Sequence, residues 1–185
     1  MRARVLAALL LGVAANVVAI GQAEAKGASE RSLARLEPAD QDIVRRIHRF
    51  QHKTWHLQHV MGRRPTPTNH TAHDPSVGRA YRLWVLNLWR RRADAARRDF
   101  QRPPHYRAWL CIHRYEGAWT DGGAPYYGGL QMDLGFQRAY GSYLLAKKGT
   151  AERWTPLEQM WVAERAVHSR GFSPWPSTAR LCGLI

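Results

Sequence analysis

The sequence EGAWTDGGAPYYGGLQ, residues 116–131, decides the fold that we predict for this chain. The pattern before it places Trp109, Ile112 and Glu116 at i, i+3 and i+7, on one face of a helix. Gly117 ends that helix, so the Glu116 carboxyl is expected where an apolar interior meets an open cleft. Partial desolvation there disfavours the charged form, as a general acid requires. Glu116 is therefore a candidate catalytic acid; the alternative is a surface Glu that closes a helix.

A glycine-rich turn follows this helix. Asp121, Gly122 and Gly123 are a strong turn signal, and the aromatic segments on either side are predicted to pair as a short, irregular hairpin. Aromatic rings stack on the apolar faces of sugars, and an amide bonds hydroxyl or N-acetyl groups. We therefore expect an open saccharide groove, or else rings packed into a small core. The candidate substrate-binding residues are Trp119, Tyr126, Tyr127, Gln131 and Trp175.

Five short motifs stand out in the C-terminal part of the chain. They are Glu116-Gly117-Ala118-Trp119, Tyr126-Tyr127-Gly128-Gly129-Leu130-Gln131, Gln159, Ala163-Glu164-Arg165 and Trp175-Pro176. Together they resemble the resuscitation-promoting-factor and transglycosylase-like domain family of actinobacteria, over about residues 104–182. The resemblance implies a small lysozyme-like fold that acts on peptidoglycan, with Glu116 as the catalytic acid. It also implies that Trp119, Tyr127 and Gln131 lie in or beside the saccharide groove.

The two cysteines depart from the positions typical of that family. There, one cysteine directly precedes the catalytic Glu, and the other closely follows Trp-Pro. Here Cys111 lies five positions before Glu116, and residues 177–181 separate Pro176 from Cys182. An exported chain with two cysteines is expected to pair them. We predict a Cys111–Cys182 disulfide; two buried free thiols are the alternative.

The number of well-placed carboxyl groups bears on the mechanism. Retaining glycosidases hold their two catalytic carboxylates about 5–5.5 Å apart, and inverting glycosidases hold them about 6.5–9.5 Å apart. Here only Glu116 has a convincing position for a catalytic carboxylate. Asp133 is read either as a helix N-cap, which we favour, or as a second carboxylate near the cleft. With one carboxyl, Glu116 acts as acid and then base, the outcome of a lytic transglycosylase. A muramidase-type hydrolase and a non-catalytic wall-binding or signalling protein are the alternatives, and no cofactor is expected.

The N-terminus and the charge predict the compartment and the partners. Two arginines precede the apolar run of residues 5–20, and Ala23-Glu24-Ala25 follows as a cleavage signal, so residues 1–25 are predicted to be a secretory signal peptide. We expect a secreted or wall-associated protein whose mature chain has no membrane span. Its net charge is +14, or +13 without residues 1–25, which favours anionic envelope polymers as partners besides peptidoglycan glycan strands. Nucleic acid is not expected, because no zinc-finger spacing or aromatic RNA-binding motif is present.

The remaining sequence predicts a helical extension. After the signal peptide we expect a basic helical region with a proline-rich linker over residues 26–103, which also binds the envelope polymers, and then the lysozyme-like domain over residues 104–185. Four histidines on adjacent turns are read as a solvated, titratable face and not as a metal site: His48, His52, His56 and His59. The predicted fold class is mainly α with a small β-hairpin, a reduced lysozyme-like domain preceded by a basic helical extension.

Overall fold

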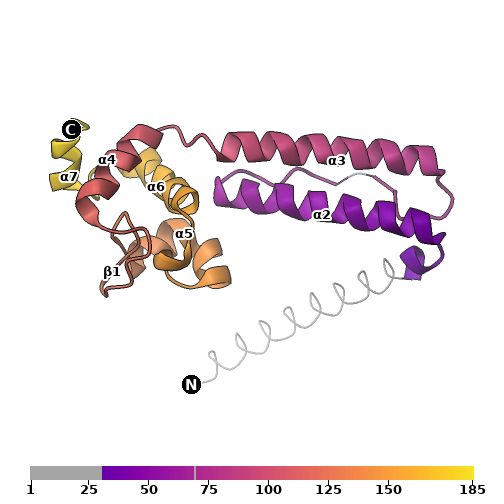
Figure 1. Cartoon of the computed structure of the whole chain (residues 1–185), viewed down its shortest axis with the longest axis horizontal. Helices are drawn as coiled ribbons and strands as arrows, with labels where there is room; N and C mark the ends of the chain where they lie inside the picture. Colours follow the sequence, from indigo (N-terminus) through magenta and orange to yellow (C-terminus); the bar gives the residue numbers. More distant parts are fainter. Residues whose placement is uncertain (1–30, 69) are drawn as a thin grey trace, which may run out of the picture. The chain divides into compact units, whose positions relative to one another are not determined.

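The computed structural model describes residues 31–68 and 70–185, and the predicted signal peptide lies outside them. The described elements, in order, are α2 (Pro38–Val60), α3 (Arg79–Phe100), α4 (Tyr106–Glu116), β1 (Tyr126–Tyr127), β2 (Met132–Asp133), α5 (Leu134–Lys148), the 3-10 helix η1 (Ala151–Arg153), α6 (Pro156–Arg170) and α7 (Pro176–Leu181) (Figure 1). The prediction of a mainly α chain with one small antiparallel hairpin is confirmed. Among the described helices, none has the length and apolar character needed to cross a bilayer.

The chain forms two compact units, and α2 and α3 contribute residues to both of them. Of the described residues, the first unit comprises 31–49, 68 and 70–88, and the second comprises 50–67 and 89–185. The division therefore falls inside both long helices and not at the predicted boundary between residues 103 and 104. Every candidate site residue lies in the second unit, together with the C-terminal halves of α2 and α3.

A buried arginine joins α2 to α3 in the first unit. Arg82 is only 2% exposed, and its guanidinium donates to Asp40 and to the carbonyls of Ala72 and Asp74. Arg79 adds a second ion pair to Asp40, at 2.6 Å. The buried charge is tolerated because each guanidinium nitrogen of Arg82 has an acceptor. Buried apolar side chains in this unit include Ile43, Val44, Ile47, Val85 and Leu86.

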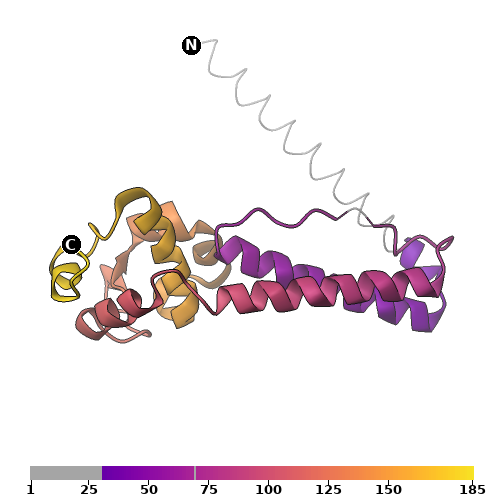
Figure 2. The same cartoon turned by 90° about the horizontal axis from the view of Figure 1, so that it is seen from above.

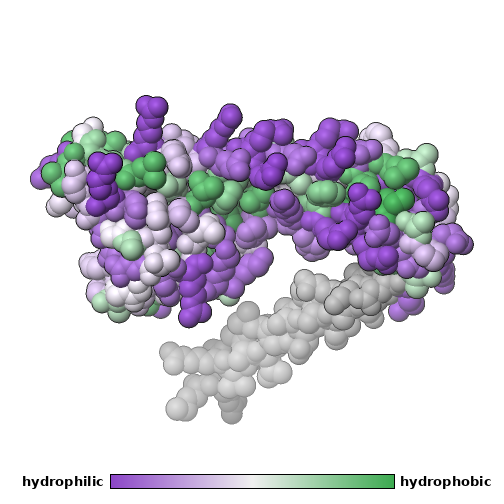
Figure 3. All heavy atoms as spheres, in the orientation of Figure 1, coloured by the Kyte–Doolittle hydropathy of each residue, from purple (hydrophilic) through white to green (hydrophobic). Residues whose placement is uncertain are grey.

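In the second unit, the end of α2 packs beside the C-terminal half of α3. The Trp55 and Trp89 rings meet edge to face, with centroids 5.8 Å apart. The proline-rich linker, residues 63–68, is extended and runs back beside α2 (Figure 2). Its Thr66 accepts hydrogen bonds from the side chains of Trp55 and Gln58. The other side of α3 is exposed and strongly basic in its last turns, and hydrophilic side chains project along α3 in Figure 3. The exposed arginines there are Arg90, Arg91, Arg97 and Arg98.

Two consecutive residues of α6 hold the neighbouring helices. Glu164 is buried and accepts hydrogen bonds from the indole N–H of Trp109 and from the main-chain N–H of His105, both at 2.8 Å, so its role is structural. Arg165 donates to the carbonyl of Val60, at 2.6 Å, where α2 ends and its last carbonyls lack helical partners. Burial lowers the pKa of Arg165 to about 10, so the guanidinium stays charged at neutral pH.

α6 begins with a capping box. The Thr155 hydroxyl accepts the main-chain N–H of Glu158, and the Glu158 carboxylate accepts the N–H of Thr155. The same carboxylate is buried and accepts hydrogen bonds from Lys148 Nζ at 2.6 and 2.7 Å. His56 Nε2 of α2 lies 3.7 Å from it. Glu158 therefore links three helices through one carboxylate.

We expect Glu158 to make the stability depend on pH. Burial raises the pKa of Glu158, but bonds from His56, Lys148 and the Thr155 N–H outweigh burial and bring it from 4.5 to about 2. A lowered folded-state pKa gives stability that is present above pH 4.5 and is lost as the pH falls toward 2. The contribution to the free energy of unfolding is at most about 3 kcal/mol. Urea unfolding should therefore show the gap between the parent and Glu158→Gln shrinking over that range; a gap that stays constant would contradict this assignment.

Candidate functional site

Glu116 is the last residue of α4, as the sequence predicts. Its side chain is half-buried, and its Oε1 accepts a hydrogen bond from Thr178 Oγ1 at 2.8 Å. Within residues 31–68 and 70–185, no group is hydrogen-bonded to its Oε2. One carboxyl oxygen is thus fixed, and the other is available to a substrate.

Gln159 holds the turn that follows α4 from the inside. Its buried side chain accepts the N–H of Gly129 at 2.9 Å and donates to the carbonyl of Trp119 at 2.8 Å. A Cβ added to Gly128 would lie 2.5 Å from Gln159 Oε1, and the φ of Gly128 is +73°, so glycine is required for both reasons. The Gly128-Gly129 pair therefore allows the backbone of the turn to approach the buried side chains beneath it closely.

The hairpin is present, but its predicted pairing is wrong. β1 pairs with β2 across the turn at residues 128–131, and not across the Asp121–Gly123 signal. Gln131 completes this turn with a φ of 47°. Asp121 instead braces the turn from outside, because its carbonyl accepts the N–H of Gly128 at 2.7 Å.

A cavity of about 430 Å³ opens beside the hairpin. Its volume lies within the range of about 300–1,000 Å³ that small-molecule sites occupy. Four predicted site residues line it: Tyr126, Gln131, Asp133 and Trp175. The remaining lining residues come from β2, α5, the end of α6 and the loop after α6: Met132, Gly135, Phe136, Ala139, Tyr140, Arg170 and Pro174. Glu116, Trp119 and Tyr127 do not line the cavity itself.

Gln131 connects this cavity to the end of α4. Its Nε2 donates to Asp121 Oδ2 at 2.9 Å and to the carbonyl of Gly128 at 3.0 Å. A Cβ on Gly117, the residue after Glu116, would lie 3.1 Å from that same nitrogen. In the described part of the chain, Gln131 Oε1 has no hydrogen-bond donor, so it can accept one from an N-acetyl or hydroxyl group.

Asp133 has the role that we favoured for it. Its Oδ1 accepts the N–H of Phe136 at 2.6 Å and so caps the N-terminus of α5. The side chain is exposed and also lines the cavity. The structure therefore confirms the cap, and a direct role of this carboxylate in chemistry stays a prediction.

Trp175 is a core residue that also lines the cavity. It is only 4% exposed, and its indole N–H donates to the carbonyl of Leu130 at 2.7 Å. Its ring packs against Trp109 and Phe136, with centroids 5.1 and 5.5 Å away. The flanking prolines do not leave this ring exposed as a free stacking platform.

Trp119 also differs from the open platform that the sequence predicts. The His113 ring stacks on it, with centroids 4.0 Å apart, and the indole packs against the hydrophobic core. A Cβ on Gly129 would lie 2.7 Å from Trp119 Cε3, which shows how closely the turn covers the indole. The half-buried ring therefore supports the turn that carries Gln131.

We expect Trp119→Ala to lower stability more than it weakens glycan binding. Loss of a packed indole typically costs about 3–5 kcal/mol, and a half-buried one about 2 kcal/mol. The matched variant is Tyr126→Ala, since Tyr126 is 50% exposed and lines the cavity; it should weaken binding with little change in stability. Urea unfolding and calorimetric titration with glycan fragments measure the two effects. Normal stability with lost binding in Trp119→Ala would make this ring a ligand platform after all.

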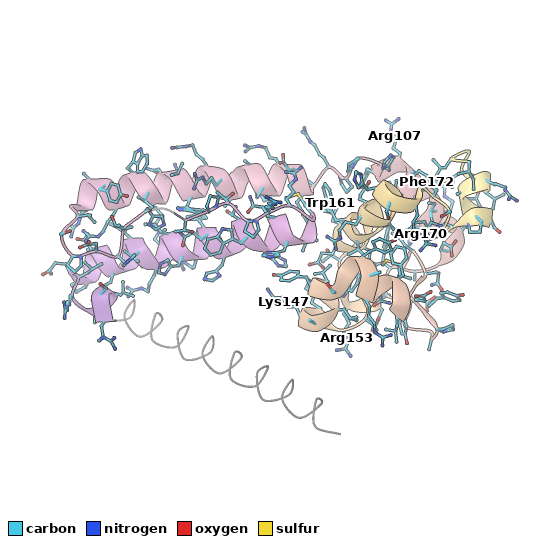
Figure 4. The ribbon with its side chains drawn as sticks, turned by 180° about the vertical axis from the view of Figure 1, so that it is seen from behind. Arg107, Lys147, Arg153, Trp161, Arg170 and Phe172 are labelled. Atoms are coloured by element: carbon cyan, nitrogen blue, oxygen red, sulfur yellow. A yellow bond between two sulfur atoms is a disulfide. The ribbon has the colours of Figure 1, made fainter. Side chains whose placement is uncertain are left out.

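Seven of the cavity's lining residues were not predicted from the sequence, Tyr140 and Arg170 among them, and neither was the partner of Glu116. Arg170, labelled in Figure 4, ends α6, and Tyr140 comes from α5. A hydrogen bond with Ser169 lowers the pKa of Tyr140; burial opposes this effect, and a hydrogen bond with Arg170 and the charge of Arg170 add to the lowering. Nothing distinguishes Arg170 from the other arginines of this basic chain, and Thr178 belongs to no recognisable motif.

The predicted disulfide is confirmed. Cys111 of α4 and Cys182, which follows α7, are bonded to each other, with their Cα atoms 6.0 Å apart. The residues that separate Pro176 from Cys182 form most of α7, which packs against α4 (Figure 1). The bond therefore joins the C-terminal segment to the helix that carries Glu116.

The histidines of α2 are not all solvated. His56 Nδ1 lies 3.0 Å from the hydroxyl of Tyr143, and the His59 ring stacks on Tyr143 with centroids 5.0 Å apart. His52 is exposed and meets Trp55 edge to face. Across the described residues, no group of three His, Cys, Asp or Glu side chains is arranged to hold a metal ion.

No protein-family model matches this sequence, and a comparison with curated proteins finds no similar one. The geometry of the site and the motifs quoted above are therefore the observations that bear on its function.

Proposed function

We propose that the protein cleaves the glycan strand of peptidoglycan as a lytic transglycosylase, with Glu116 as its acid and base. The observation that carries this proposal is the Glu116 carboxyl at the end of α4, with Oε1 held by Thr178 and with no hydrogen bond to Oε2 from any described residue. The resemblance of the surrounding motifs to transglycosylase-like domains supports the same substrate. The nearby cavity, with one amide oxygen available and an exposed tyrosine, suits a sugar.

The proposed reaction needs a single carboxyl group. Glu116 gives its proton to the glycosidic oxygen as the bond from that oxygen to the anomeric carbon breaks. The leaving sugar keeps this proton, and the carboxylate that remains is stabilised by the Thr178 hydroxyl. The 6-hydroxyl of the same substrate then attacks the oxocarbenium centre and gives its proton to Glu116, which closes an anhydro ring and restores the acid. Attack by water in place of the 6-hydroxyl gives the hydrolase outcome.

Binding is proposed to depend on the turn and the cavity. Gln131 Oε1 accepts a hydrogen bond from an N-acetyl or hydroxyl group, and Tyr126 offers an exposed ring face beside it. The net charge of +14, together with the arginines of α3, favours attraction to an anionic cell wall. Export through the N-terminal segment and residence at the wall belong to the same proposal.

Mass spectrometry of muropeptides released from purified peptidoglycan tests this function. The anhydro product is expected, and new reducing ends would favour a hydrolase. An intact glycan with retained binding in a sedimentation assay would favour a non-catalytic wall-binding protein. A preparation of the Glu116→Gln variant, purified identically, controls for contaminating wall enzymes.

A further inference from the structure

We propose that Thr178 is a positioning residue that holds the Glu116 carboxyl and serves both of its protonation states. This inference rests on the proposed function, because it assigns the group that prepares Glu116 for acid and base chemistry. Thr178 is 8% exposed, so its hydroxyl is shielded from solvent that would otherwise compete for the carboxyl oxygen. It donates to Glu116 Oε1 at 2.8 Å.

The hydroxyl has a second acceptor within reach. Thr178 Oγ1 lies 3.4 Å from the carbonyl oxygen of Trp175, the residue that precedes α7. When Glu116 is ionised, the hydroxyl donates to Oε1 and stabilises the negative charge. When Oε2 carries the proton, the hydroxyl still donates to Oε1; when Glu116 takes its proton back on Oε1, the hydroxyl turns to the Trp175 carbonyl and accepts from the carboxyl group, because a hydroxyl both donates and accepts. The contact is therefore preserved through a cycle in which Glu116 loses and regains a proton.

This arrangement also selects the reacting oxygen. While Thr178 donates to Oε1, the acidic proton of Glu116 resides on Oε2. Oε2 has no hydrogen-bond partner among the described residues, so its proton is free for the glycosidic oxygen. Thr178 thus orients the acid without touching the substrate.

α7 is held in place to provide this contact. The Cys111–Cys182 disulfide and the Glu116–Thr178 hydrogen bond occur in opposite order along α4 and α7, so the two helices run antiparallel. The N–H of Cys182 donates to the carbonyl of Thr178 at 3.0 Å, which couples the two links. The cysteine positions that depart from the family pattern leave room for this short helix. The disulfide therefore fixes the position of α7 along the axis of α4, and so keeps Thr178 beside Glu116.

The deciding comparison uses Thr178→Val, which keeps the shape and removes the hydroxyl, and Thr178→Ser, which keeps the hydroxyl. Relative to the parent, Thr178→Val should lower kcat about tenfold, since a hydrogen bond to a charged group is lost, with KM little changed. The alkaline limb of its pH profile should move to higher pH, because a carboxylate without its donor keeps a proton more readily. Thr178→Ser should retain the parent kcat and profile. Should Thr178→Val fail to fold, Thr178→Ala removes the same hydroxyl and is judged by the same readouts.

A measurement independent of activity accompanies these assays. The carboxyl carbon resonance of Glu116, followed by NMR during a pH titration, should have a higher midpoint in Thr178→Val than in the parent and in Thr178→Ser. Equal midpoints in all three proteins, or equal loss of kcat in the Ser and Val variants, would overturn the role of the Thr178 hydroxyl. Full activity of Glu116→Gln would instead reject the proposed function, and the NMR titration would still decide the role of Thr178.

Discussion

Glu116→Gln should lower the rate of peptidoglycan cleavage by about 100-fold or more while the protein stays folded. Glutamine keeps an oxygen that accepts the hydrogen bond from Thr178, so the packing of α4 against α7 is preserved. It has no proton to give to the glycosidic oxygen, and it cannot take one back. Release of soluble muropeptides measures the rate, and thermal unfolding measures the fold.

Glu37→Gln provides the matched control, since Glu37 is exposed and lies in the other compact unit. It removes one negative charge from the same basic chain, so it reports any general effect of charge on attraction to the wall. We expect parent activity from it. Equal activity of Glu116→Gln and Glu37→Gln would show that Glu116 is not the acid.

Replacing both cysteines by serine should lower stability and activity together. The disulfide closes a loop whose ends are 71 residues apart in sequence, and the chain-entropy model gives about 4 kcal/mol for such a bond. The activity should fall because α7 is no longer fixed against α4, so Thr178 loses its position beside Glu116. Differential scanning calorimetry and the muropeptide assay measure the two effects.

Two observations would contradict this prediction. Non-reducing peptide mapping of the freshly secreted parent should show the Cys111–Cys182 bond, and two alkylatable thiols would refute it. A double variant that melts earlier but cleaves at the parent rate would show that α7 keeps its place without the disulfide. The reduced parent is the appropriate comparison, because it differs from the oxidised parent only at this bond.

The features predicted well from sequence are those set by nearby residues. The end of α4 at Glu116 and the cap formed by Asp133 each depend on groups a few positions apart. Such signals can be read from a short window, because the backbone itself brings the groups together. The disulfide was predictable for another reason, since an exported chain with two cysteines has one possible pair.

The features predicted poorly depend on distant parts of the chain. The hairpin turns at residues 128–131 because Gln159, 30 positions away, binds the N–H of Gly129. The rings of Trp119 and Trp175 are covered by partners that no local pattern specifies. Thr178 reaches Glu116 across 62 positions of sequence. Burial and long-range contacts of this kind are decided by the assembled fold.

Arg165 of α6 holds the end of α2, so the unit that contains the site includes part of the preceding helix. The C-terminal segment from residue 104 does not contain its whole core, because Leu57, Val60 and Met61 of the preceding segment pack into it. The chain enters this unit at residue 50, leaves it at 67 and returns at 89. No single cut separates one unit from the other, and a ribosome must release nearly the entire chain before the core can close. Transfer of this site to another protein, by recombination or by design, would therefore have to include the helical residues before position 104.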